Sequence, residues 1–261
     1  MLKIVLHATT VIPWQKRWTQ FFVEGFKKHN IDIEVSSSTQ KVDCDIAILF
    51  GPNRWKNIEK SGIPFIMVNR KFFGKEEHVA GDIVALSWDG FNGEGYHCVK
   101  DIDPNRLAKF IDIENDIKEW QLDGTEYLVC GQADAGRSNL NLKDWYQSIN
   151  VGNRFRPHPT KAGTVLKPLS EDLVNVKAAI TLNSTVAVEV LIEGIPVIAM
   201  DAGNPLYGNV GHSVNEIRFP ERIPMLTHLA HCQWHHSEIS NGAFWKQLYP
   251  KTGNKLSEFS V

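Results

Sequence analysis

The chain has 261 residues, of which 43% are hydrophobic and 22% are charged, and its formal net charge is −2. This length and composition suffice for one large core or two smaller ones, which excludes a disordered chain. The near-neutral charge gives no overall attraction to nucleic acid or anionic membranes, and the four cysteines lack the Cys-x-x-Cys spacing of a zinc site.

Strands and helices alternate through the first hundred residues. The aromatic residues between 14 and 29 recur at helical spacing, which predicts a helix whose aromatic stripe faces a core rather than a stacked base. Neither a signal peptide nor a membrane span is visible in the sequence, so we expect a cytoplasmic protein. The other apolar runs predict a short helix at 54–61 and strands at 2–6, 31–35, 45–50, 65–68 and 82–87.

A second alternating series follows a polar crossing over 103–121. Its expected strands are 126–130, 154–156, 178–181 and 196–200, its expected helices are 142–149, 170–176 and 184–193, and two closing helices follow residue 223. Strands that alternate with helices favour parallel sheets covered on both faces. We therefore expect an α/β fold with two Rossmann-like domains facing a cleft, residues 1–110 and 111–222, and C-terminal helices over 223–261 that pack back on them.

Polar loops follow three strands of the second series. Gln132 follows the first strand, Arg156 and His158 follow the next within an Arg-Pro-His-Pro string, and Asn183-Ser184-Thr185 opens the helix after the third. Such a helix start leaves backbone N–H groups unpaired and carries the positive end of the helix dipole, so it suits an anion such as a phosphate. Because the carboxyl ends of parallel strands meet at one edge of a sheet, these loops predict a phosphate-bearing ligand.

A loop of the first series has related features. After the strand at 82–87 the sequence continues through Asp89, Gly90, Gly93 and Gly95, and its glycines let the backbone approach a ligand closely. We expect this strand to end in the same sense as the strands before it, which would place the Asp89 carboxylate at the cleft.

Five blocks of the sequence, in one order, carry a resemblance to a known family. The blocks are 88–95, 129–135, 156–159, 181–193 and 204–211. Together they resemble the capsule polysaccharide glycosyltransferase family, a GT-B-type group that includes the Kdo transferases that build capsule linkers. The resemblance implies a GT-B-like fold and a glycosyltransferase that moves a sugar from a CMP- or UDP-sugar donor to an acceptor hydroxyl.

The resemblance also implies which residues bind the donor. Its phosphate would contact His158 and the helix start at Asn183-Ser184-Thr185, with the positive charge of Arg156 nearby. Gln132 would line the nucleotide pocket, and Glu189 would reach a ribose or sugar hydroxyl.

Asp89 matches the position that supplies the catalytic carboxylate in the family. It would act as a general base on the acceptor hydroxyl or as a nucleophile toward the anomeric carbon. Two departures bear on these roles: Arg156 stands where the family has lysine, and Trp88 stands where an acidic residue often precedes the Asp-Gly pair. The second departure leaves the electrostatic tuning of Asp89 open.

The expected enzyme uses neither a cofactor nor a metal, because GT-B-type enzymes stabilise the departing phosphate with a helix N-terminus and cationic side chains. The pair His235-His236 lacks a third ligand at a suitable spacing. Two Asp-x-Asp strings, at 43–45 and 101–103, lie before a strand and before the polar crossing, away from the expected cleft.

The acceptor and several residue roles stay open. The acceptor is a saccharide or, in a phage-encoded member acting in the host cytoplasm, a hydroxymethylated pyrimidine in DNA. A nucleotide-sugar 2-epimerase, or a non-catalytic nucleotide- or DNA-binding module, would share the architecture. Each of these residues also has a purely structural interpretation. His158 would be part of a simple turn, Asn183-Ser184-Thr185 would be an ordinary N-cap, and Asp89-Gly90 would be a turn. The basic residues that would contact DNA phosphates are Lys16, Arg17, Lys27, Lys28, Arg70, Lys71 and Lys75.

Overall fold

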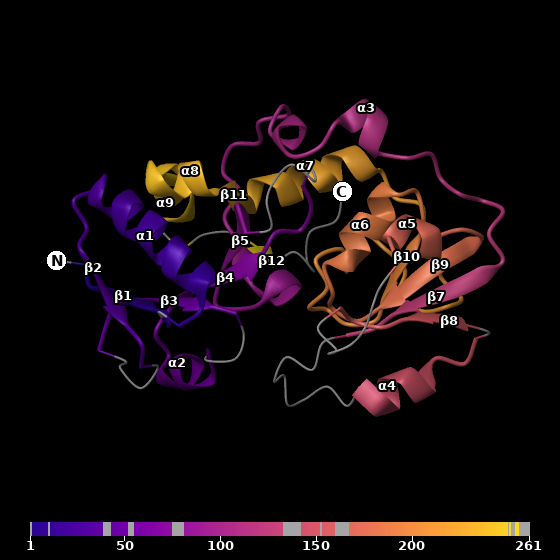
Figure 1. Ribbon diagram of the computed structural model, residues 1–261, viewed down its shortest axis with the longest axis horizontal. Helices are drawn as coiled ribbons and strands as arrows, with labels where there is room; N and C mark the ends of the chain where they lie inside the picture. The colour runs from indigo at the N-terminus through magenta and orange to yellow at the C-terminus, as the bar shows by residue number, and fades with distance from the viewer. Residues whose placement is uncertain are drawn as a thin grey trace.

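Two β-sheets, one built mainly from each half of the chain, form the framework of the protein (Figure 1). Helices cover both faces of each sheet, which confirms the expected mixed α/β class. The structure is a computed structural model. It describes residues 2–9, 11–38, 43–51, 55–74, 81–132, 142–151, 153–159, 167–249, 251 and 254–255.

The first sheet has a parallel centre. Its strands β1 and β3 are buried along their whole length, as expected for strands covered on both faces. Helix α1 (Pro13–Lys27) covers one face with Trp18 and Phe22, and α2 (Trp55–Ser61) covers the other with Ile58, so the predicted aromatic stripe does face a core. The parallel strands are β1 (Ile4–His7), β2 (Ile33–Ser36), β3 (Ile46–Phe50) and β4 (Phe65–Arg70).

One strand of this sheet runs against the direction expected from the sequence. Strand β5 (Ile83–Trp88) pairs antiparallel with β4, with Ile66 opposite Trp88 and Arg70 opposite Val84. The end of β5 therefore lies at the edge where β4 begins, and the expectation that it ends in the same sense as the earlier strands is wrong. Apolar alternation predicts that a segment is extended but carries no information about its direction.

The second sheet is parallel throughout, in the order β10-β9-β7-β8. Helix α6 (Val186–Ile192) covers one face and α4 (Leu142–Ser148) covers the other. The expected alternation of strands and helices is confirmed here. The remaining elements are α3 (Ile113–Asp116), β7 (Glu126–Cys130), β8 (Asn153–Arg156), α5 (Leu169–Asp172), β9 (Val176–Thr181) and β10 (Val197–Ala199).

The C-terminal segment returns to the first sheet. A Cβ on Gly25 of α1 would lie 2.0 Å from the carbonyl oxygen of Ile239, so only glycine lets these helices approach. The sequence predicts only helices here and misses β11, because three residues are too few for a recognisable alternation. Among the described residues, each helix falls short of the length and hydrophobicity of a transmembrane span. The elements are α7 (Arg222–His231), β11 (Gln233–His235) on β5, α8 (His236–Ser240), α9 (Ala243–Leu248) and β12 (Asn254–Lys255) on β6 (Tyr96–His97).

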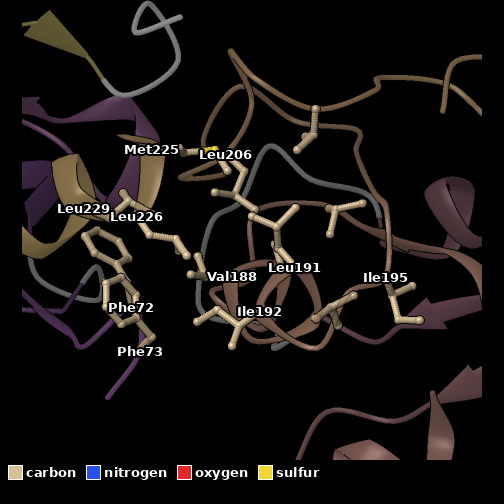
Figure 2. Packing of buried hydrophobic residues seen from close by; sticks show 14 of the residues in the cluster. Phe72, Phe73, Val188, Leu191, Ile192, Ile195, Leu206, Met225, Leu226 and Leu229 are labelled. Carbon is tan, nitrogen blue, oxygen red and sulfur yellow. The ribbon is translucent and has the colours of Figure 1, made fainter. Parts of the chain in front are cut away.

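A continuous apolar core joins the two sheets (Figure 2). Phe72 and Phe73, which follow β4, belong to the same cluster as Leu226 and Leu229 of α7 and Val188 of α6. Burial of one such side chain contributes roughly 1.5–3 kcal/mol. Each sheet with its covering helices is called a half of the protein below, and the region where the two meet is called the junction. The two halves are therefore held together by packing.

A buried arginine ties the segment between the sheets to the C-terminal helices. The Arg106 side chain is 7% exposed. Its Nη1 donates to Oε1 of Glu238 at 2.8 Å, its Nε donates to the carbonyl oxygen of Ala230 at 2.7 Å, and its guanidinium lies 4.7 Å from the Trp234 ring centroid. A buried charge that loses its partner keeps its desolvation cost.

Replacement Arg106→Met should lower the free energy of unfolding by about 3–5 kcal/mol, because Glu238 and the Ala230 carbonyl lose their donor. Denaturant titration followed by circular dichroism measures this change. The control Lys3→Met breaks an exposed ion pair with Asp43 and should leave the unfolding midpoint unchanged. Equal effects of the two replacements would contradict a structural role for Arg106.

Two histidines make stability sensitive to acid. Burial lowers the pKa of His97 and of His228 from 6.5 to about 4. The folded state then binds fewer protons than the unfolded chain between these values, so stability is lost as pH falls through this window and is constant above it. For His97 the full loss is roughly 3 kcal/mol. Urea titrations from pH 7.5 to 4.5 should show the decline, and His97→Gln should make it shallower; a midpoint independent of pH would refute this.

Candidate functional site

The carboxyl ends of β7 and β8 meet as the sequence predicts. Both strands are parallel neighbours, and the N–H of Gly131 donates to the carbonyl oxygen of Arg156 at 2.7 Å. A Cβ on Gly131 would lie 2.9 Å from the backbone nitrogen of His158. Glycine at 131 therefore lets the His158 loop lie directly against the end of β7.

His158 interacts electrostatically with a cation from the other sheet. Its side chain is half-buried, and its pKa is lowered first by burial and then by the positive charge of Arg70. Arg70 is the last residue of β4, so the edge of the first sheet lies near the loop after β8. The like charges disfavour the protonated imidazole, and an anion between them would reverse this effect.

Glu189 of α6 and Lys71, which follows β4, form a second electrostatic interaction between the two sheets. The Glu189 side chain keeps solvent access although protein atoms surround it closely. This desolvation raises its pKa, and the charges of Lys71 and Arg156 act in the opposite direction. Burial lowers the pKa of Lys71, which Glu189 opposes. This interaction, like that of Arg70 with His158, joins the end of β4 to the second sheet.

Arg156 is anchored by the protein itself. Its Nη1 donates to the carboxylate of Asp172 in α5 and to the carbonyl oxygen of Lys167, the latter at 3.0 Å. Its side chain is 14% exposed. Part of its charge is therefore already neutralised, and its contact with a donor phosphate stays a prediction.

The start of α6 combines a local cap with a contact between the halves. The Ser184 hydroxyl accepts a hydrogen bond from the Val186 N–H at 3.3 Å, whereas Thr185 occupies the N-cap position without a side-chain bond. Asn183 is 1% exposed, and its carbonyl oxygen accepts from Nδ2 of Asn92 at 3.2 Å. Ser184 thus makes a local bond to the first residue of α6, whereas the N-cap residue Thr185 makes none, and phosphate binding at this helix start stays a prediction.

Gln132 lies at the end of β7, beside the His158 loop. Its backbone N–H donates to the Tyr146 hydroxyl at 3.0 Å, and its side-chain Oε1 is buried without a hydrogen-bond partner among the described residues. The loop continues into Asp134 and Ala135, which lie outside the described residues.

Asp89 occupies a different edge. One carboxylate oxygen accepts from the Phe65 N–H at 2.8 Å and the other pairs with Lys251. Because Phe65 begins β4 and Arg70 ends it, Asp89 lies roughly 16 Å from Arg70 along the strand. The structure therefore does not bring Asp89 and Arg70 together, although the loop that starts at Asp89 reaches the second half through Asn92.

Two cations of the site were not assigned to it from the sequence. The sequence indicates a role for Arg70 and Lys71 only among the residues that would contact DNA. Neighbouring residues in the sequence do not indicate that these two cations interact with His158 and Glu189. Lys75 of the same group lies outside the described residues. Within the described ranges no three His, Cys, Asp or Glu side chains form a metal-binding group. The expected independence of metals stays a prediction.

No protein-family model and no curated protein matches this sequence. Two solved structures share its fold. Thermosulfurimonas dismutans KpsC, beta Kdo 2,4 transferase, is 11% identical over 88% of this chain and 91% of its own, with a TM-score of 0.54. Thermosulfurimonas dismutans KpsC, beta Kdo 2,7 transferase, is 14% identical over 94% of this chain and 99% of its own, with a TM-score of 0.50. This chain therefore shares a mixed α/β fold with two Kdo transferases over most of its length.

Proposed function

We propose that this protein is a glycosyltransferase that moves a sugar from a CMP- or UDP-sugar donor to a saccharide hydroxyl. The observation that carries the proposal is the meeting of the loops after β7 and β8, where the N–H of Gly131 donates to the carbonyl oxygen of Arg156. The cations Arg70 and Lys71 at the end of β4 interact electrostatically with His158 and Glu189 there. A GT-B-like arrangement would hold the donor at this junction. The fold shared with two Kdo transferases supports this class of reaction.

The group that needs most stabilisation during sugar transfer is the leaving phosphate. As the bond to the anomeric carbon breaks, charge grows on the leaving phosphate, so cations that face it stabilise the transition state more than the ground state. His158 and Arg70 would supply this charge without a metal. A phosphate bound between them would raise the depressed pKa of His158 and let its imidazolium donate a hydrogen bond.

We propose a saccharide acceptor rather than DNA, because the formal net charge of −2 gives the protein no overall attraction to DNA. Arg17 of α1, one of the candidate contacts to DNA phosphates, pairs with Asp82 at 2.8 Å. A partly neutralised cation adds little to phosphate binding.

CMP or UDP should raise the melting temperature of the protein by an amount that grows with the logarithm of the nucleotide concentration over its Kd, and GDP provides the comparison. Replacement His158→Asn should weaken nucleotide binding about tenfold, the equivalent of about 1.4 kcal/mol. Affinity of the wild type should also rise as pH falls from 8 to 6, because phosphate binding takes up a proton at His158, and this gain should shrink in the variant.

The matched control is His236→Asn, since His236 stacks on Phe21 at the surface of α1 and α8. It should bind nucleotide like the wild type at every pH. A wild-type protein whose melting temperature responds to none of the three nucleotides would disprove the proposed donor.

Asp89→Asn tests the catalytic carboxylate that the resemblance implies. Asparagine still accepts a hydrogen bond from the Phe65 N–H, so folding and nucleotide binding should persist. A catalytic Asp89, which lies roughly 16 Å from Arg70 along β4, requires closure of the two halves over the donor, and sugar transfer by the variant should then fall at least a hundredfold. Mass spectrometry of a saccharide acceptor incubated with the donor measures transfer. Undiminished transfer by this variant would mean that Asp89 is not catalytic and serves only to hold the loop after β5 to Phe65 and Lys251.

A further inference from the structure

Two buried asparagines meet where the halves of the chain join. Asn92 lies in the loop after β5 and is 2% exposed, and Asn183 lies between β9 and α6 and is 1% exposed. Nδ2 of Asn92 donates to the backbone carbonyl oxygen of Asn183 at 3.2 Å. The Asn92 side chain therefore lies against the backbone of Asn183, where the loop after β5 meets the segment between β9 and α6.

Each of these side chains has a buried polar atom without a hydrogen-bond partner in the described part of the chain. Oδ1 of Asn92 and Nδ2 of Asn183 are buried and have no hydrogen-bond partner in the described part of the chain, and the same holds for the hydroxyl of Thr181 at the end of β9. Because the Asn92 bond to a carbonyl oxygen requires its NH₂ group, the unused atom of that side chain is an acceptor. The unused atom of Asn183 is a donor. Buried polar atoms in proteins nearly always have partners, so these atoms call for one.

The same junction contains an asparagine of a purely structural kind. Asn204 is fully buried, its Nδ2 donates to the carbonyl oxygen of Leu182 at 2.8 Å, and its Oδ1 accepts from the N–H of Leu206 at 3.0 Å. The N–H of Gly93 also donates to the carbonyl oxygen of Gly203 at 3.0 Å. These bonds hold the junction together without the unused ends of Asn92 and Asn183.

We propose that Asn92 and Asn183 form a subsite for a hydroxyl group of the donor sugar, an inference that rests on the proposed function. A hydroxyl both donates and accepts, so it satisfies the Oδ1 acceptor of Asn92 and the Nδ2 donor of Asn183 together. A phosphate or carboxylate offers only acceptors and would face Oδ1 unfavourably. Asn183 directly precedes Ser184 and Thr185, so a hydroxyl here would belong to the sugar next to the donor phosphate.

This subsite would select among donor sugars. A sugar that lacks the hydroxyl leaves two buried atoms unpaired, and sites built around such hydrogen bonds reject the deficient ligand strongly. A buried water has the same hydrogen-bonding capacity, so the experiment must separate a sugar from water.

The test compares the affinity of a nucleotide sugar with that of its free nucleotide, using UDP-glucose with UDP and CMP-N-acetylneuraminate with CMP in calorimetry. The ratio of the two dissociation constants isolates the contribution of the sugar. Asn183→Ala removes the donor and keeps the backbone carbonyl that binds Asn92. Asn92→Gly removes the acceptor and suits the left-handed backbone at that position, where φ is 48°. In both variants the ratio should shift at least tenfold toward the free nucleotide, whose own affinity should change less than twofold.

Thr227→Val serves as the control, because it removes a buried hydroxyl whose hydrogen bond, to the carbonyl oxygen of Ile223, lies within α7; it should leave the ratio unchanged. An unchanged ratio in the two variants, with nucleotide binding intact, would mean that only a buried water occupies the location and would overturn the subsite alone. Failure of the wild type to bind any of the four ligands would overturn the proposed function together with the subsite. The two asparagine variants act independently, so misfolding of one leaves the other decisive.

Discussion

The packing between the two sheets is the constraint on which the candidate site depends. Phe72 enters the shared core directly after Lys71, and Val188 enters it directly before Glu189. The packing that joins the halves therefore also brings Lys71 within electrostatic range of Glu189. A change in the packing of either apolar residue would displace a charged neighbour, which couples the stability of the junction to the electrostatics of the site.

At the junction, the surroundings of His158 and of Glu189 disfavour the charged forms of both side chains. Arg70 and His158 are both basic, and their proximity lowers the pKa of the imidazole rather than forming an ion pair. Glu189 sits in surroundings that disfavour its charge. Perturbed groups of this kind gather at functional sites, because a bound ligand supplies the charge or hydrogen bond that the fold leaves out. An anion bound between the two sheets would stabilise the protonated form of His158, and this interaction would contribute to the binding free energy.

The loop after β5 shows how one segment serves both stability and recognition. Asp89 and Asn92 adopt left-handed backbone conformations, with φ of 52° and 48°. Asp89 secures the start of the loop through Phe65 and Lys251, while Asn92 and Gly93 reach the second half. A Cβ on Gly93 would lie 2.4 Å from the carbonyl oxygen of Asn204, so the close approach of the halves requires glycine there. The anchoring contacts are thus separate from the unused amide ends.

Local periodicity in the sequence was enough to predict the longer strands of both sheets, but not the short strands β6, β11 and β12. It also predicted the helix that Asn183-Ser184-Thr185 precedes and the meeting of the loops that carry Gln132 and His158. These features depend on residues close together in the chain or on the general geometry of parallel sheets. The reversed direction of β5, the return of β11 to it, and the partners of Asp89 had no local signal. The same is true of Arg70 and Lys71 beside His158 and Glu189. Those contacts join residues separated by tens of positions or more, and they exist only because the apolar residues around Phe72 and Val188 pack into one core.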